Sequence, residues 1–138
     1  MLASMAVIRI LIADDVPELR AIFRLLLNSD DRFEVVGEAA DGLEAIDRAR
    51  ELQPDLVLLD IAMPKLDGLQ AIPRIHEAVR DVRILVLSGF ETAKIAEQAI
   101  ALCATAFLEK GAATDKIVSL AHEVALSPPK KHPVPVTP

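Results

Sequence analysis

The chain has 138 residues, 52% of them hydrophobic and only 3% aromatic, and its 15 basic and 21 acidic side chains give a net charge of −6. This length is typical of one domain with a core of its own, which Val, Ile, Leu and Ala must fill. The acidic balance and the lack of Trp and Tyr argue against direct nucleic-acid binding, and no apolar run approaches the roughly 18 residues of a membrane helix. A single cysteine and a start without signal-like features lead us to expect a cytoplasmic location.

Short apolar runs recur along the chain and indicate the strands. They lie at residues 7–13, 34–39, 55–59, 83–87 and 105–108. Continuous apolar runs of four to seven residues are typical of strands that are buried on both faces of a parallel sheet. The sequence therefore predicts five such strands.

Segments with helical spacing separate the first three strands. After the first strand, apolar side chains recur at the spacing i, i+3, i+4 and i+7, in Leu19, Ile22, Phe23 and Leu26. Pro17 suits the first turn of this helix, where its missing N–H is harmless. Asp41, followed three residues later by Glu44, predicts an N-cap with a capping-box-like partner for the second helix.

Three further helices follow the third, fourth and fifth strands. Their helical faces are marked by Leu69, Ile72, Ile75, His76 and Val79, then Ile95, Ala99 and Leu102, and finally Ile117, Leu120, Ala121 and Val124. Pro73 conflicts with the third helix, because a proline in a helix interior removes a backbone hydrogen bond and costs about 3 kcal/mol. That helix is expected either to start late, near Ala71, or to be kinked in its first turn. Thr114 is the candidate cap of the fifth helix.

Five strand–helix pairs in succession predict an α/β fold, a doubly wound parallel sheet with helices on both faces. We expect residues 7–126 to form this domain and residues 1–6 to be an N-terminal extension. Residues 127–138, SPPKKHPVPVTP, contain five prolines and are expected to form an extended, disordered tail.

Polar and charged side chains come directly after four of the predicted strands. Asp14 and Asp15 follow the first strand, Asp60 the third, Ser88 the fourth and Lys110 comes shortly after the fifth. Ligands of open parallel sheets bind beyond the carboxyl ends of the strands, where these side chains would meet. A single aspartate at such a place is usually only a helix cap or a loop residue. The joint occurrence of these side chains after four strands is a much stronger indication of a functional site.

This set of side chains fits metal-assisted phosphoryl chemistry. Three neighbouring carboxylates repel one another unless a cation is present, and a small cluster of oxygen ligands suits Mg²⁺. A lysine supplies a compact positive charge for one phosphoryl oxygen, and a serine hydroxyl can donate a hydrogen bond to another. One carboxylate is then left to attack phosphorus and form an aspartyl phosphate.

Residues 56–68, LVLLDIAMPKLDG, closely match the phosphorylation-site segment of receiver domains in two-component response regulators. The remaining site positions are matched at family-like spacings by Asp14, Asp15, Ser88 and Lys110, so the chain resembles this family over about residues 9–125. The segments VVGEA at 35–39 and DG at 41–42 are most similar to those of receivers from the subfamily with a helix-turn-helix output domain. The resemblance implies a flavodoxin-like receiver fold with five strands in the order 2-1-3-4-5.

The resemblance also implies a role for each site residue. Asp60 would accept the phosphoryl group, and Lys110 and Ser88 would contact it. Mg²⁺ would be bound by four groups: the carboxylates of Asp14, Asp15 and Asp60 and the backbone carbonyl of Ala62. Phe107 occupies the switch-aromatic position of the family, although core packing explains a phenylalanine there equally well.

The implied partner is a sensor histidine kinase or a histidine phosphotransfer protein, and phosphorylation-linked homodimerisation is a further expectation. The output surface is expected on the fourth helix, the fifth strand and the fifth helix, with the exposed polar residues Glu91, Lys94, Glu97 and Gln98. Cys103 takes a place where glycines are frequent, so it must accept a strained backbone or end the fourth helix differently.

Two positions tune the lifetime of the phosphoryl group in this family, and Ala62 and Phe90 occupy them here. Neither side chain can orient an attacking water molecule. We therefore expect slow autodephosphorylation.

Two alternative functions stay open. The chain can be the excised regulatory domain of a DNA-binding transcription factor, since the twelve residues after Leu126 are too few for a helix-turn-helix domain. An Asp-dependent phosphohydrolase would use the same aspartyl phosphate chemistry, but it typically has a second aspartate two residues after the nucleophile, where this chain has Ala62. We therefore expect no enzyme activity beyond autophosphorylation and autodephosphorylation.

Overall fold

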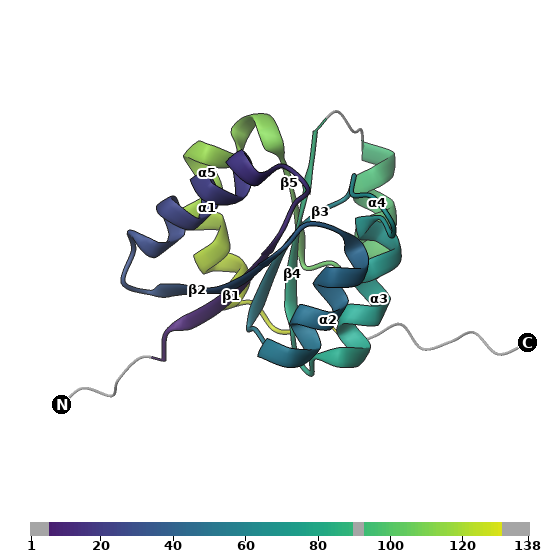
Figure 1. The fold of residues 1–138 in the computed structure, drawn as a ribbon, viewed down its shortest axis with the longest axis horizontal. Coiled ribbons are helices and arrows are strands. Elements are labelled where there is room, and N and C mark those ends of the chain that lie inside the picture. The colour runs from purple at the N-terminus through teal and green to yellow at the C-terminus, as the bar shows by residue number, and fades with distance from the viewer. Residues whose placement is uncertain (1–5, 90–92, 131–138) are drawn as a thin grey trace, which may run out of the picture.

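The computed structural model describes residues 6–89 and 93–130, which contain a five-stranded parallel sheet (Figure 1). The strands are β1 (Ile8–Ala13), β2 (Phe33–Ala39), β3 (Leu56–Asp60), β4 (Arg83–Ser88) and β5 (Ala106–Glu109). Their order in the sheet is β2-β1-β3-β4-β5, which confirms the predicted topology. Each strand begins and ends within one residue of its predicted bounds.

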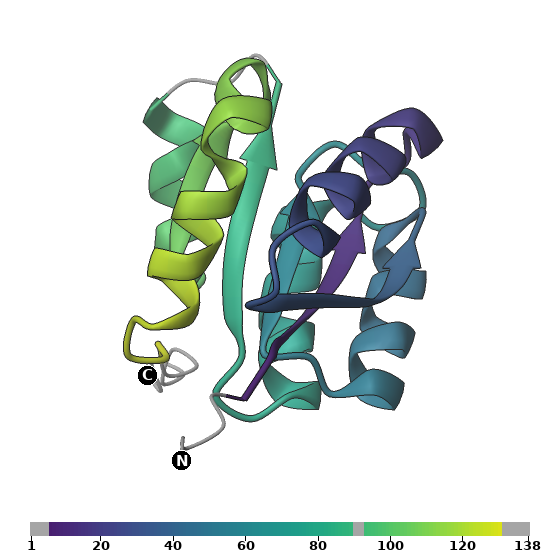
Figure 2. The same cartoon turned by 90° about the vertical axis from the view of Figure 1, so that its left-hand side faces the viewer.

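Helices cover both faces of the sheet. They are α1 (Pro17–Asn28), α2 (Gly42–Leu52), α3 (Gly68–Ala78), α4 (Ala93–Ala101) and α5 (Lys110–Ala125). α1 and α5 lie on one face, and α2, α3 and α4 lie on the other (Figure 1, Figure 2). None of the helices in the described residues combines the length and the apolar character that spanning a membrane requires.

Two hydrophobic clusters fill the space between the sheet and the helices. In β1, Leu11 and Ala13 belong to the cluster under α2 and α3, whereas Ile10 and Ile12 belong to the cluster under α1 and α5. All four side chains are buried, because successive residues of a strand point to opposite faces and both faces are covered. This double burial explains why the central strands β3 and β4 are nearly continuous apolar runs, whereas β2 at the sheet edge carries Glu34 and Glu38.

The predicted start of α2 is confirmed. The backbone N–H of Glu44 donates a hydrogen bond to Asp41 Oδ1 at 2.8 Å, and the N–H of Ala40 donates to Glu44 Oε1 at 2.7 Å. The two carboxylates thus satisfy backbone donors that the helix itself leaves without partners. Pro17 lies in the first turn of α1, as predicted.

The predicted late start of α3 near Ala71, one of two alternatives, is wrong. The helix begins at Gly68, and the N–H of Gln70 donates a hydrogen bond to the side chain of Asp67 at 2.9 Å. Pro73 therefore lies inside the helix. The capped start and the buried apolar face of α3 offset the backbone hydrogen bond that the proline removes.

The predicted cap of the last helix at Thr114 is also wrong. α5 begins at Lys110 and directly follows β5, with Glu109 at the N-cap position and no side-chain cap. Thr114 lies within the helix and is exposed. Ile117, Ala121 and Val124 of α5 are buried against the sheet, so packing stabilises the helix without a polar cap.

The backbone at Cys103 is left-handed, with a φ of 73°. This confirms that Cys103 accepts the strain that its position implied. His76 Nε2 lies 2.8 Å from the carbonyl oxygen of Cys103, which links the loop after α4 to α3.

Part of the predicted output surface can be located. Glu97 and Gln98 are exposed on α4, as predicted. Phe90, Glu91 and the side chain of Lys94 lie outside the described residues, as do residues 1–5 and 131–138.

Candidate functional site

Three aspartates meet at the carboxyl ends of β1 and β3. Asp14 directly follows β1, Asp60 is the last residue of β3, and the two strands are neighbours in the sheet. Asp14 and Asp60 are buried, with exposed fractions of 0% and 1%, whereas Asp15 is exposed. One carboxylate oxygen of each aspartate lies within 4.8 Å of the others. The structure thus brings together the three acids that the sequence analysis places in one site.

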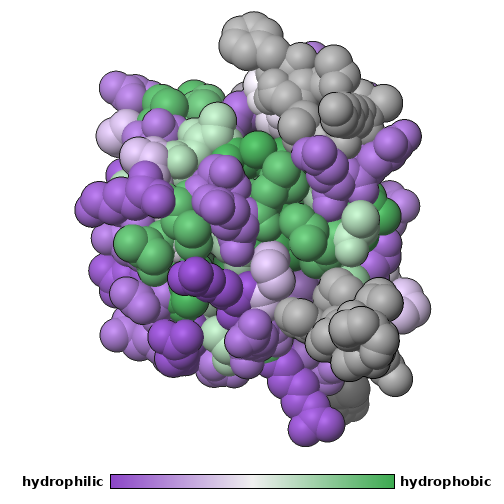
Figure 3. Space-filling view, turned by 90° about the vertical axis from the view of Figure 1, so that its right-hand side faces the viewer, coloured by the Kyte–Doolittle hydropathy of each residue, from purple (hydrophilic) through white to green (hydrophobic). Residues whose placement is uncertain are grey.

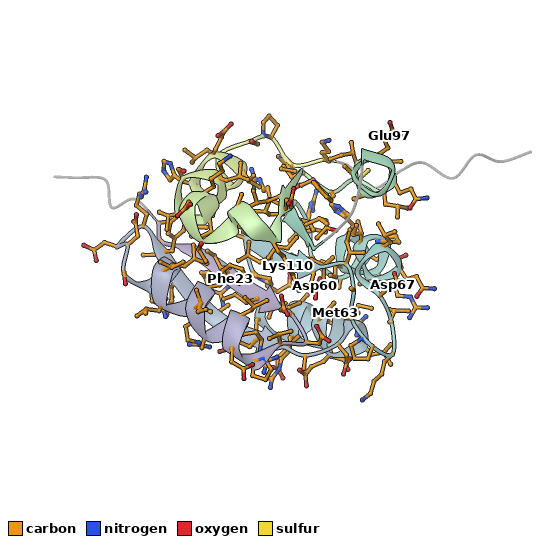
Figure 4. All side chains as sticks on the ribbon, turned by 90° about the horizontal axis from the view of Figure 1, so that it is seen from above. Phe23, Asp60, Met63, Asp67, Glu97 and Lys110 are labelled. Carbon is orange, nitrogen blue, oxygen red and sulfur yellow. The ribbon has the colours of Figure 1, made fainter. Side chains whose placement is uncertain are left out.

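Lys110 supplies a positive charge at this place. It is the first residue of α5, and its Nζ lies 3.0 Å from Asp14 Oδ2 and 3.1 Å from Asp60 Oδ2. Figure 4 looks onto this edge of the sheet and shows Lys110 beside Asp60. One ammonium group neutralises only part of the charge of three carboxylates. We call Asp14, Asp15, Asp60 and Lys110 the acidic site.

In each buried aspartate one oxygen accepts a backbone N–H and the other faces Lys110. The N–H of Val16 donates to Asp14 Oδ1 at 2.8 Å, and the N–H of Ala62 donates to Asp60 Oδ1 at 3.1 Å. Within the described part of the chain, neither Oδ2 atom accepts a hydrogen bond of normal geometry, although the Lys110 ammonium is within ion-pair distance of both. Two such buried oxygens beside a third, exposed carboxylate fit a hard divalent cation such as Mg²⁺.

Burial and neighbouring charges change the pKa values of the acidic site. Burial first, and then the Asp14 carboxylate, raise the pKa of Asp60 to about 6, although Lys110 and the Ala62 N–H act against this rise. Burial by itself lowers the pKa of Lys110, but its contacts with Asp14 and Asp60 more than offset this, so the pKa lies above its usual value. The ionised acidic site therefore lacks positive charge, which a bound divalent cation would supply.

Ser88 and Phe107 lie on the two strands beyond β3. Ser88 ends β4, is buried, and follows Leu87, which pairs with Asp60 across the sheet. Its position is therefore at the same sheet edge as the acidic site. Phe107 lies on β5 and packs against the hydrophobic cluster under α2 and α3. Core packing accounts for this contact, and a switching role for Phe107 stays a prediction.

The loop after β3 passes close to Asp60 because residue 68 is a glycine. The N–H of Gly68 donates to the carbonyl oxygen of Ile61 at 2.8 Å. A Cβ atom at Gly68 would lie 2.3 Å from the carbonyl oxygen of Asp60 and 2.7 Å from Ile61 Cα, which is closer than packed atoms allow. Ala62 is exposed in this loop, next to the acidic site, and metal binding by its carbonyl stays a prediction.

An arginine that the sequence analysis does not single out also contacts Asp14. Arg20 of α1 donates from Nη1 to the backbone carbonyl of Asp14 at 2.6 Å and from Nε to Glu38 Oε1 at 2.9 Å. Arg24 donates to the second oxygen, Glu38 Oε2, at 2.6 Å. No spacing in the sequence signals these contacts, because they require β1 and β2 to be neighbours.

The match to known families agrees with this geometry. The family described as response regulator receiver domain matches residues 10–122 of the chain. The chain belongs to this family. The family resemblance inferred from the LVLLDIAMPKLDG segment and the strand-end residues is thereby confirmed.

Two curated relatives of this receiver domain are longer proteins. A protein-glutamate methylesterase/protein-glutamine glutaminase 1 of Methanospirillum hungatei is 46% identical over 105 residues, which cover 75% of this chain and 31% of that protein. The virulence factors putative positive transcription regulator BvgA of Bordetella pertussis is 37% identical over 116 residues, which cover 84% of this chain and 55% of that protein. The receiver domain thus spans about a third to a half of the length of these relatives.

A solved structure confirms the flavodoxin-like receiver fold. The response regulator domain of Thermotoga maritima CheB superposes with a TM-score of 0.83 at 30% sequence identity. The superposition covers 90% of this chain and 100% of that domain.

Proposed function

We propose that this receiver domain accepts a phosphoryl group on Asp60 from the phosphohistidine of a sensor histidine kinase or a histidine phosphotransfer protein. The observation that supports this most directly is the buried Asp60 carboxylate beside the Lys110 ammonium at the sheet edge. An Asp60 oxygen forms a bond to phosphorus, the phosphorus–nitrogen bond of the donor breaks, and the donor imidazole keeps the electron pair. The products are an aspartyl phosphate and a free histidine.

Asp14, Asp15 and Asp60, together with the carbonyl of Ala62, would hold Mg²⁺. The two buried Oδ2 atoms without hydrogen bonds of normal geometry, and the short spacing of the three carboxylates, support this assignment. When bound, Mg²⁺ neutralises negative charge on the oxygens of the transferring group. The chain itself orients the two buried carboxylates through the N–H groups of Val16 and Ala62.

Lys110 and Ser88 would contact the phosphoryl oxygens. Lys110 lies against both buried carboxylates, so a phosphoryl group on Asp60 would carry its new charge within reach of this ammonium. A hydrogen bond from the Ser88 hydroxyl would draw the carboxyl end of β4 toward Asp60. Phe107 on the neighbouring strand would follow this shift, so that phosphorylation favours one of two conformations.

The output surface in this proposal comprises α4, β5 and α5. α4 carries a shallow hollow of about 520 Å³, lined by Ala96, Glu97, Ile100 and Ala101. Figure 3 views the side of the molecule that carries α4, where apolar side chains gather between polar ones. A surface of this mixed character suits phosphorylation-linked contacts with an output partner or with a second copy of the domain.

The domain acts here as a switch, without turnover of a substrate. Autophosphorylation and autodephosphorylation are the only reactions that we assign to it. Ala62 occupies the position where Asp-dependent phosphohydrolases typically have an aspartate, so we do not propose hydrolase activity. Phosphoryl transfer from a sensor kinase implies a cytoplasmic location.

We also propose that the domain is the regulatory part of a transcription regulator. Its similarity to BvgA, of which it covers 55%, supports this. The acidic receiver domain itself would not bind DNA, because phosphate contacts require clustered basic side chains. Sequencing of the reading frame beyond Pro138 tests the proposal. A DNA-binding domain there would support it, and a stop codon would favour a receiver that acts alone.

Adduct formation on Asp60 tests the proposed phosphoryl transfer. The protein is incubated with Mg²⁺ and acetyl phosphate, and in parallel with beryllofluoride, and the adduct is followed by intact-mass spectrometry and NMR. We expect the adduct in the wild type and in the control Asp47→Asn, which changes an exposed acid of α2, but not in Asp60→Asn. Modification that persists in Asp60→Asn would overturn the assignment.

A further inference from the structure

We infer that Arg20 is a positioning residue that orients Asp15 of the acidic site through the peptide group between Asp14 and Asp15. The inference rests on the proposed function, because it concerns the binding of Mg²⁺ by these aspartates. It assigns a role to a side chain outside the set of proposed metal and phosphoryl contacts.

The Arg20 guanidinium contacts two parts of the chain at once. Its Nη1 donates to the carbonyl oxygen of Asp14 at 2.6 Å, and its Nε donates to Glu38 Oε1 at 2.9 Å. The Arg20 side chain is only 17% exposed. A planar guanidinium with two fixed donors, held at one end by a carboxylate, gives the carbonyl a defined direction.

The remaining polar groups of Asp14 are also engaged. Its N–H donates to the carbonyl oxygen of Ala39 at 3.0 Å, and its Oδ1 accepts the N–H of Val16 at 2.8 Å. Oδ2 is the atom that faces Lys110. The position of Asp14 is therefore fixed by contacts on the backbone and on the side chain.

The contact with Arg20 extends this fixation to Asp15. The carbonyl of Asp14 and the N–H of Asp15 belong to one planar peptide group, so the direction of the carbonyl determines where the Cα of Asp15 lies. Asp15 is exposed, and its carboxylate lies within 4.8 Å of those of Asp14 and Asp60. Without Arg20, the peptide group could rotate and carry the Asp15 carboxylate away from the other two.

Glu38 keeps Arg20 in place. Burial by itself raises the pKa of Glu38, but Arg24 and Arg20 outweigh this effect and lower it, so Glu38 is ionised at neutral pH. Glu38 lies in β2, next to the end of β1, and faces α1. The ion pair therefore holds the guanidinium over the peptide group that it orients.

Arg24 offers a matched control on the same helix. It donates to Glu38 Oε2 at 2.6 Å, and Glu38 is its one hydrogen-bond and ion-pair partner within the described residues. Replacing Arg24 removes an ion pair with Glu38 but leaves the carbonyl of Asp14 bound. Arg20→Gln and Arg24→Gln thus differ chiefly in the contact with Asp14.

Two measurements test the inference. The Mg²⁺ dissociation constant is measured by isothermal titration calorimetry, because the chain has no Trp or Tyr as a fluorescent reporter. We expect Arg20→Gln to weaken Mg²⁺ binding about tenfold and Arg24→Gln to weaken it less than about twofold. In the absence of Mg²⁺, the ¹⁵N shift of the Asp15 amide should change in Arg20→Gln and stay near the wild-type value in Arg24→Gln.

The outcomes separate the inference from the proposed function. Equal Mg²⁺ affinities and an unchanged Asp15 amide in a folded Arg20→Gln variant would overturn the inference alone. A wild-type domain that binds no Mg²⁺ would overturn the proposed metal site, and with it the part of the inference that concerns metal. Arg20→Lys keeps the charge but lacks the planar pair of donors, so it should restore only part of the affinity. Full affinity in Arg20→Lys would show that charge alone acts, which would also overturn the inference.

Discussion

The Asp60 carboxylate lies 3.1 Å from the Lys110 ammonium, yet Asp60 Oδ2 accepts no hydrogen bond of normal geometry within the described residues. The same ammonium lies 3.0 Å from Asp14 Oδ2, so two buried carboxylates share one lysine. Burial and the neighbouring Asp14 carboxylate raise the pKa of Asp60 to about 6, although Lys110 acts against this rise. In the metal-free domain the ionised Asp60 carboxylate therefore opposes folding near neutral pH, whereas the Lys110 ammonium beside it favours folding.

Asp60→Asn should stabilise the metal-free domain at pH 7. The pKa of Asp60 rises from its ordinary value of 3.8 to about 6 on folding. The folded state therefore holds the proton more tightly, and its stability decreases as the pH rises through this window. This pKa difference corresponds to a loss on the order of 3 kcal/mol in the free energy of unfolding at pH 7, and the Asn variant would avoid this loss. Urea unfolding in EDTA at pH 4 and pH 7 measures this, and the same pH dependence in both proteins would contradict the prediction.

Lys110→Met should destabilise the domain, because it leaves two buried carboxylates without their cation. Removing one partner of a buried ionic group lowers the free energy of unfolding by on the order of 3 kcal/mol. Urea unfolding at pH 7 measures this loss. The control Lys65→Met removes an exposed lysine that lies 3.5 Å from Asp41 and should cost less than about 1 kcal/mol. Adding Asp60→Asn to Lys110→Met should recover much of the loss. Strictly additive effects of the two substitutions would show that the charges do not interact.

Gly68→Ala should disturb the loop after β3. The new methyl group would lie 2.3 Å from the carbonyl oxygen of Asp60, and a backbone atom cannot rotate away as a side chain can. We expect a loss on the order of 2 kcal/mol in the free energy of unfolding and weaker Mg²⁺ binding. Gly111→Ala is the control, since its Cβ would meet Glu109 Oε1 at 3.5 Å and alanine favours the helix. Equal stability of the two variants would argue against a close approach at Gly68.

Ala62→Asn should shorten the lifetime of the aspartyl phosphate. Ala62 is exposed, and its N–H already contacts Asp60 Oδ1, so an amide side chain there can orient a water molecule for attack on phosphorus. A positioning hydrogen bond worth about 1 kcal/mol corresponds to about fivefold faster hydrolysis. The half-life of the phosphorylated protein measures the effect, with Ala21→Asn on the exposed side of α1 as the control. A wild-type lifetime of seconds that the substitution leaves unchanged would refute the expected slow autodephosphorylation.

The sequence by itself located the strands and the acids of the site. Apolar runs predicted all five strands within one residue, because helices cover both faces of the sheet and β3 and most of β1 and β4 are buried. Asp14, Asp15, Asp60, Ser88 and Lys110 could be assigned to one edge because parallel strands place their carboxyl ends together. The strand order came from the family resemblance carried by the LVLLDIAMPKLDG segment, since apolar runs do not specify which strands are neighbours.

Only the tertiary structure decided where two helices begin and what holds Asp14. Capping signals and propensities contribute about 1 kcal/mol each, so packing overrode the predicted cap at Thr114 and the late start of the helix with Pro73. The contacts of Arg20 with Asp14 and Glu38 left no local signal, because Glu38 lies 18 residues away and meets Arg20 only across the β1–β2 pair. Short-range patterns report burial and local geometry, whereas contacts between distant side chains exist only once the sheet has formed.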